Sequence, residues 1–199
     1  PSEASLVSGD TLIPIKLALR SFTELVAVKP GTEALVIKKG KTPKSPDWLR
    51  AVKPTAPLSL GVLFREQGKT WDHPRILLLE DDADSFPAGK VRFVNASDKV
   101  VIVHIGGAKS KSFGIAPGKF SIKAVVEGSN MIKVGYLESD GSSKLIWKND
   151  FKVEADQRVQ CFFFNAELER RGKRKIQLSY FPETIPKLSG KADAKQSGK

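Results

Sequence analysis

Apolar residues in this chain recur mainly at every second position, in short segments bounded by Gly, Pro, Asn and Asp. Such alternation is typical of β-strands, whose successive side chains point to opposite faces. No segment shows the i, i+3, i+4, i+7 spacing of a capped amphipathic helix. The pattern therefore predicts an all-β protein, most simply an antiparallel β-sandwich.

The predicted strands are rich in β-branched or aromatic residues and end at turn residues. They cover residues 11–20, 24–28, 33–39, 58–66, 75–80, 90–96, 99–105, 111–115, 119–127, 131–138, 144–154, 158–169 and 175–181. Phe120, Ile122, Ala124 and Val126 share one face, which predicts a half-buried strand. The segments 75–80 and 161–164 are apolar on both faces and should lie centrally, covered on both sides.

The remaining segments lack this alternation. Residues 45–52 come closest to a helix and could form one turn before Pro54, within a Lys- and Pro-rich segment (38–57) predicted to be a long connection. Residues 187–199 carry basic and small polar residues and are predicted to be a disordered tail.

The organisation predicted from these segments is a single sandwich body over residues 1–186. A weak internal similarity allows two related half-units, residues 11–86 and 90–181. The alternative is that unrelated β-strands and turns simply share the same residue types.

Charge and cysteine content add limited information. Thirty-three Lys and Arg against 22 Asp and Glu give a net charge of +11, which favours polyanionic partners but also keeps exposed strand edges soluble. The single cysteine, Cys161, excludes an intrachain disulfide and is expected to be buried. No apolar run is long enough for a transmembrane helix. Because the chain begins at Pro1, we expect a processed product whose signal peptide, if any, has been removed.

The segment 104–118 brings a histidine, glycines and lysines together and raises the question of a ligand site. A phosphate-binding glycine loop leads into a helix, whereas this segment leads into a strand. Gly106 and Gly107 instead predict a hairpin turn, and Pro117–Gly118 a type II turn. His104 should then be a partly buried side chain with a hydrogen-bond partner.

Two places in the sequence raise the question of a metal site. Residues 86–120 resemble part of a cupredoxin, a family that holds copper with two His, one Cys and usually a Met. Cys161, however, has no His or Met in the following dozen residues, and His73 is the only histidine besides His104. The acidic run 80–84 lacks the order of a calcium loop and is predicted to be a solvated turn. We expect no cofactor, and a cupredoxin-like metal site stays as an alternative.

Catalytic motifs of hydrolases, metalloproteases and cysteine enzymes are absent from the sequence, which predicts a non-enzymatic protein. The most pointed charge feature is a basic run between two predicted strands, expected at a hairpin tip. Its candidate polyanion-binding residues are Arg170, Arg171, Lys173, Arg174 and Lys175. An ordinary exposed tip is the alternative, because no aromatic residues that could stack on bases are interleaved.

Four motifs resemble a family of uncharacterised extracytoplasmic bacterial β-sandwich domains. They are VRFVNAS (91–97), VHIGG (103–107), IAPGKFSI (115–122) and VEADQRVQCFFF (153–164). This resemblance, over about residues 90–181, implies an immunoglobulin-like fold, a periplasmic or secreted location and no catalytic residues. It favours a binding or scaffolding module whose partner is a protein or a component of the cell envelope.

Overall fold

Strands are the regular secondary structure of this protein, as the alternation predicted. The computed structural model describes residues 3–17, 22–66, 68–106, 110–124, 128–166 and 175–185, and no helix occurs in these ranges. The predicted disordered tail, 187–199, lies outside them. The all-β sandwich class is confirmed. An immunoglobulin-like topology stays a prediction.

The first half contains a sheet and a separate hairpin. The first sheet has the order β2-β1-β3-β4, and the hairpin pairs β5 with β6. Their bounds are β1 (Ala4–Ser8), β2 (Thr11–Ile15), β3 (Ala34–Lys38), β4 (Asp47–Val52), β5 (Ser59–Phe64) and β6 (Arg75–Glu80). Leu6, Ile37 and Leu49 of the first sheet form a core against which Leu63 and Ile76 of the hairpin pack.

The helical turn predicted within residues 45–52 is wrong, because this segment forms β4. The register of β3 against β4 shifts at Lys38, so Trp48 is an extra residue, a β-bulge. Trp48 and Leu49 are consequently both buried, although they are adjacent in sequence. Two consecutive buried residues break the alternation expected of a strand, and the predicted long connection therefore contains a strand of the first sheet.

The second half is a two-sheet sandwich. Its middle sheet has the order β10-β7-β13-β14, and its outer sheet β12-β11-β8-β9. The bounds are β7 (Lys90–Ala96), β8 (Val101–Ile105), β9 (Lys111–Ile115), β10 (Lys119–Ala124), β11 (Gly128–Leu137), β12 (Ser143–Val153), β13 (Gln157–Asn165) and β14 (Ile176–Thr184). Among the described residues, the strand pairings are antiparallel except that of β7 with β13, which is parallel.

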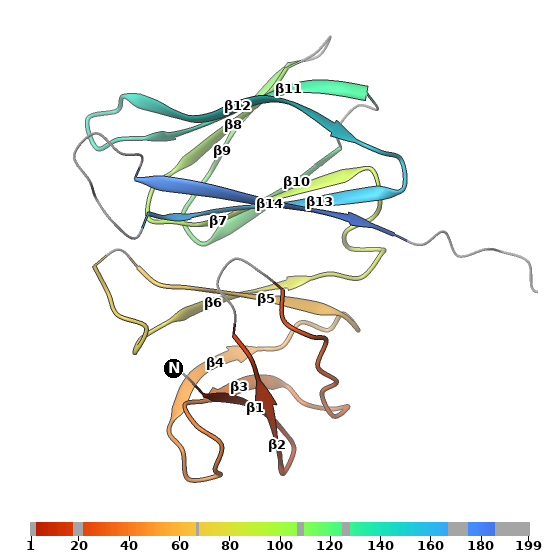
Figure 1. The fold of residues 1–199 in the computed structure, drawn as a ribbon, viewed down its shortest axis with the longest axis vertical. Helices are drawn as coiled ribbons and strands as arrows, with labels where there is room; N and C mark the ends of the chain where they lie inside the picture. Colours follow the sequence, from red (N-terminus) through yellow and green to blue (C-terminus); the bar gives the residue numbers. More distant parts are fainter. Residues whose placement is uncertain are drawn as a thin grey trace, which may run out of the picture.

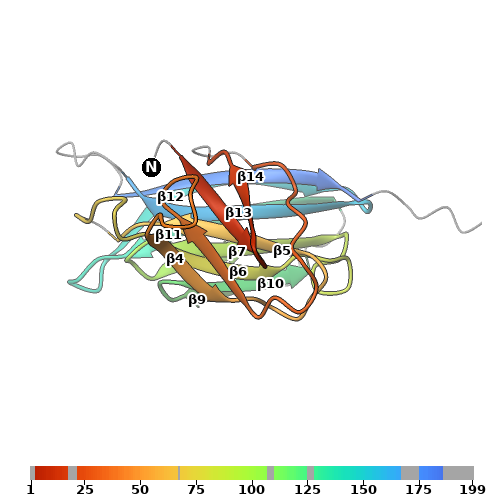
Figure 2. The same cartoon turned by 90° about the horizontal axis from the view of Figure 1, so that it is seen from below.

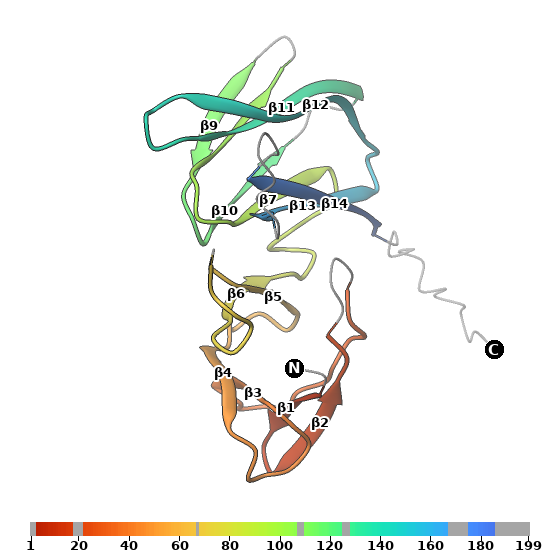
Figure 3. The ribbon, with the colours of Figure 1, turned by 60° about the vertical axis from the view of Figure 1, so that its left-hand side comes forward.

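The layers are stacked in one direction, as Figure 1 shows: outer sheet, middle sheet, hairpin β5–β6, then the first sheet. Seen from below, the strands of the first sheet run obliquely to β13 and β14 (Figure 2). The hairpin thus lies between the first sheet and the middle sheet, an arrangement also visible from the side (Figure 3). The central strands of the middle sheet, β7 and β13, are covered on both faces (Figure 1), which confirms the central position predicted for residues 161–164.

The edge strand β10 departs from its predicted burial. Phe120 pairs with Val94 on the face of the middle sheet that points away from the outer sheet, and it is 46% exposed. Ala124 is exposed as well. Apolar and polar residues do alternate along β10, but the apolar residues lie on a face that the hairpin β5–β6 does not cover at this edge of the sheet. The prediction of a half-buried strand is therefore wrong for Phe120 and Ala124, and Val126 lies outside the described residues.

A buried ionic cluster joins the two halves. Asp81, directly after β6, accepts hydrogen bonds from Arg92 Nη1 at 2.7 Å and from Arg158 Nη2 at 3.3 Å. Arg158 also donates to the backbone oxygens of Asp81 and Phe86, at 2.8 and 3.1 Å. Both guanidinium groups lie over the ring of Phe86, 4.1 and 5.1 Å from its centroid. Burial raises the pKa of Asp81, and the two arginines act against that shift.

This cluster corrects the prediction of a solvated acidic turn at residues 80–84. Asp81 is buried, whereas Asp82 caps its own turn by accepting hydrogen bonds from the backbone N–H groups of Asp84 and Ser85. Those bonds lower the pKa of Asp82. Within the acidic run, Asp81 therefore connects the two halves of the molecule, and the residues that follow it form a turn.

Candidate functional site

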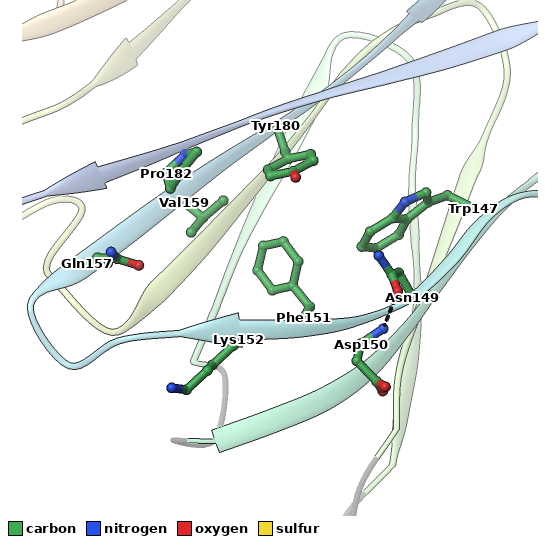
Figure 4. Close-up of a pocket in the computed structure, with 9 residues that line it drawn as sticks. All are labelled: Trp147, Asn149, Asp150, Phe151, Lys152, Gln157, Val159, Tyr180 and Pro182. Carbon is green, nitrogen blue, oxygen red and sulfur yellow. Dashed lines mark hydrogen bonds between the residues drawn. The ribbon is translucent and has the colours of Figure 1, made fainter.

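A groove opens along one side of the sandwich, between edge strand β12 of the outer sheet and strands β13 and β14 of the middle sheet. Figure 4 shows its lining, and its volume is about 270 Å³. The side chains that define it are Trp147, Asn149 and Phe151 from β12, Gln157 from β13, and Tyr180 and Pro182 from β14. These residues occupy the inner faces of the two sheets at the point where the core reaches solvent.

A β-bulge places the tryptophan in this groove. Val134 of β11 pairs with Trp147, but Gly135 pairs with Leu145, so Ile146 is the extra residue. Ile146 is buried and Trp147 half-buried, both on the inner side of the sheet. A Cβ atom at Gly135 would lie 2.8 Å from the backbone oxygen of Lys144, so the close approach of the two strands at the bulge requires glycine.

Three aromatic rings form a continuous apolar wall. Trp147 meets Phe151 edge-on, with ring centroids 6.0 Å apart, and Phe151 meets Tyr180 at 6.2 Å. Phe151 is buried, while Tyr180 is 54% exposed. An exposed tyrosine supported by a buried phenylalanine is a preorganised contact surface, because its position is held by packing before any ligand arrives.

The polar side chains on the inner side of the groove are neutral and largely uncommitted, whereas the charged Asp150 and Lys152 line its rim. Asn149 Oδ1 accepts a hydrogen bond from the backbone N–H of Asp150 at 3.0 Å. Among the residues that the structure describes, no hydrogen bond engages the Asn149 amide nitrogen, the Trp147 indole N–H, the Gln157 side chain or the Tyr180 hydroxyl. The groove therefore combines aromatic surface with several donors and acceptors, the combination found in small-molecule sites.

A pattern in the sequence points to this groove, although it was not among the features from which a site was predicted. Trp147, Asn149 and Phe151 alternate along one strand, and a polar residue between two aromatic residues on a core-facing side indicates an opening in the core. The partners across the groove, Gln157 and Tyr180, come from later strands. Sequence spacing alone does not bring them to β12.

The predicted basic site lies mostly outside the described residues: Arg170, Arg171, Lys173 and Arg174 all do. Lys175 is described, and its Nζ contacts Glu138 Oε2 at 3.1 Å. Lys144 and Lys99 approach the same carboxylate at 3.1 and 3.9 Å. Hydrogen bonds from Lys144 and Lys175 lower the pKa of Glu138. Three ammonium groups thus lie around the carboxylate of Glu138, and one of them belongs to Lys175, which directly follows the basic segment 167–174 in sequence.

The residues considered for a copper site are not brought together. Cys161 points into the sandwich core, and burial raises its pKa to about 12. His104 lies on the opposite side of the outer sheet, where its Nδ1 and the Ser112 hydroxyl form a 2.8 Å hydrogen bond, as expected for a partnered, partly buried histidine. His73 belongs to the first half. Within the described ranges, no three His, Cys, Asp or Glu side chains are grouped to hold a metal ion.

Two of the motifs that carry the family resemblance, Asn95–Ser97 and Pro117–Gly118, have structural roles. The buried Asn95 side chain donates to the backbone oxygens of Lys99 and Ile115, and its Oδ1 accepts from the Ser97 hydroxyl at 2.6 Å. Gly118 has a φ of +67° and donates its N–H to the Asn95 backbone oxygen, which confirms the Pro117–Gly118 turn. Asn-x-Ser and Pro-Gly therefore lock two loops together on the scaffold.

Fold and groove together define an all-β protein that combines a sandwich, a stacked second unit and an aromatic side groove. No protein-family model matches the chain, and no curated protein matches it significantly in sequence. The described part of the chain contains no helix that is long and apolar enough to cross a bilayer. The family resemblance of residues 90–181 accordingly stays a prediction, and functional argument rests on the groove itself.

Proposed function

We propose that this protein is a non-enzymatic binding module of the bacterial cell envelope, periplasmic or secreted, and that its working surface is the aromatic groove. The groove carries the proposal: an exposed Tyr180 and a half-buried Trp147 stand beside uncommitted amide groups at the edge of a rigid sandwich. Its walls come from two sheets that share one core, so the groove is held open by the fold itself.

The envelope location is supported by the resemblance of residues 90–181 to extracytoplasmic bacterial domains. A scaffolding role is supported by the way the two halves are joined, since the Asp81 cluster and an aromatic cluster both bridge them. Phe22 contacts Phe181 at 5.0 Å and Phe162 at 6.4 Å between ring centroids. These contacts connect the sandwich that carries the groove to the first half of the molecule at two places.

Retention on a washed bacterial envelope preparation tests this function. We expect the protein to co-sediment with the preparation, and the double variant Tyr180→Ala, Gln157→Ala to bind about thirtyfold more weakly, because two contacts of about 1 kcal/mol each are lost. The matched control is Phe120→Ala, which removes an exposed aromatic ring far from the groove. Equal retention of the groove variant and the control would contradict the proposal.

A second candidate function is polyanion binding at the end of the sandwich that carries the basic segment 167–174. The observation that favours it is the gathering of Lys99, Lys144 and Lys175 on the single carboxylate of Glu138, next to four further cationic residues in sequence. A phosphate or sulfate group could replace Glu138 as the partner of these lysines.

Elution from immobilised heparin separates this second candidate from the first. We expect the variant with Arg170, Arg171, Lys173 and Arg174 all changed to Gln to elute at lower salt than the parent protein. We expect Glu138→Gln to elute at higher salt, because the lysines lose their internal partner. Identical elution of parent and both variants rules this function out, and the groove double variant serves as the control that should elute with the parent.

A further inference from the structure

We propose that the ligand of the aromatic groove is a neutral sugar, one or two rings of a glycan chain. The inference rests on the proposed function, since it names the ligand class of the same groove. Sugar rings present an apolar C–H face and a rim of hydroxyl groups that each donate and accept. The groove offers the counterpart of both, an aromatic wall and a set of mixed donors and acceptors.

The aromatic wall accounts for the apolar face. Tyr180 is more than half exposed yet fixed from behind by Phe151, and Phe151 is fixed in turn by Trp147. Because these rings stand at an opening that faces solvent, part of their apolar surface stays in contact with water and does not contribute the stabilisation that burial gives to the rest of the core. A flat apolar ligand face resting on Tyr180 and Trp147 would recover it.

The polar groups account for the hydroxyl rim. The Trp147 indole and the Asn149 amide nitrogen donate, whereas the Gln157 amide and the Tyr180 hydroxyl both donate and accept. Sugar hydroxyl groups can form hydrogen bonds with both the donors and the acceptors of the groove. A proline-rich peptide offers mainly carbonyl acceptors, so it would leave the acceptor capacity of Gln157 and Tyr180 unused when water is excluded.

Charge indicates a neutral ligand. The two charged side chains at the rim, Asp150 and Lys152, stand on the other face of β12, and Figure 4 shows both pointing away from Phe151 and Tyr180. Lys152 is already paired with Glu154 at 2.8 Å. A charged ligand group in the groove would therefore lose hydration without an opposite charge to replace it.

Size sets the length of the ligand. A groove of about 270 Å³ is slightly smaller than the sites that enclose drug-sized molecules. Its walls come from β12, β13 and β14, and the connection from β12 to β13 lies at the end marked by Lys152 and Gln157 (Figure 4). One or two rings can rest inside while the rest of a glycan chain continues outside.

The test is a titration of the full chain with three neutral trisaccharides, cellotriose, maltotriose and tri-N-acetylchitotriose, followed by ¹⁵N NMR. We expect at least one of them to shift the Trp147 indole resonance, assigned with Trp147→Phe, together with the Asn149 and Gln157 side-chain amides. The dissociation constant should not change between about 50 and 200 mM salt, because the ligand carries no charge.

Variants and competing probes make the outcomes distinct. Gln157→Ala should weaken sugar binding about fivefold or more, and Tyr180→Ala further, while Phe120→Ala should bind as the parent does. If no trisaccharide shifts these resonances but the groove variant still loses envelope retention, the sugar assignment is wrong and the binding module stands. If a proline-rich decapeptide or a heparin fragment shifts them instead, the assignment is overturned in favour of that class. Loss of both sugar binding and groove-dependent retention rejects the proposed function as well.

Discussion

The variant Asp81→Ala is expected to lower the free energy of unfolding by about 3–5 kcal/mol, because it leaves the buried guanidinium group of Arg92 without a carboxylate and removes one of the two carboxylates that pair with Arg158. Arg92 is 1% exposed and Arg158 only 4%. Their remaining partners are backbone oxygens, Gln160, Glu183 and the ring of Phe86.

Urea unfolding measures this effect. The matched control is Asp72→Ala, which removes an exposed carboxylate that pairs with Lys39 at 2.6 Å and should change stability little. A further variant, Asp81→Leu with Arg92→Met, should recover part of the loss, because it removes a charge together with its partner. Similar stabilities of Asp81→Ala and Asp72→Ala would show that the Asp81 cluster does not hold the halves together.

The second large effect is expected for Phe163→Ala, which should cost about 3–5 kcal/mol through lost burial and the cavity left behind. Phe163 is fully buried and lies parallel to Phe93 at 6.4 Å between centroids. Phe93 in turn meets Phe113 edge-on at 5.7 Å. These three rings come from both sheets of the sandwich, so the cavity would open between the sheets.

Thermal or urea unfolding of Phe163→Ala, beside Phe120→Ala, tests this prediction. Both changes delete the same atoms, but Phe120 is 46% exposed and should lose far less stability. Equal losses would mean that the rings of β13 and β10 are buried to the same extent, contrary to the structure. A measured loss well below 3 kcal/mol for Phe163→Ala would mean that the sheets close over the cavity.

Alternation of apolar residues predicted the strands well wherever the strands are regular. The predicted segments 75–80, 90–96 and 111–115 coincide with β6, β7 and β9. The prediction failed where a bulge turns two consecutive residues inward, as at Trp48–Leu49. It also missed β1 and expected a strand at residues 24–28, where Val26 and Val28 pack on the first core without strand pairing.

The candidate site was less accessible to sequence reasoning. Asp81 looked like part of a solvated turn, because its partner Arg158 is 77 positions away in the chain. The groove likewise depends on β12 lying opposite β14, and no local sequence pattern predicts which strands of the two sheets lie opposite each other. Charge density is a local property, so it directed attention to residues 170–175, most of which lie outside the described residues.

The parallel pairing of β7 with β13 has a consequence for the order in which the molecule can form. Arg92 and Gln160 stand side by side in that pair, although 68 positions separate them. During synthesis β7 emerges well before β13, so the pairing of these two strands waits until most of the described strands have been made. Closing the long loop between β7 and β13 costs conformational entropy before their contacts stabilise the protein. This is the condition under which β-proteins fold slowly.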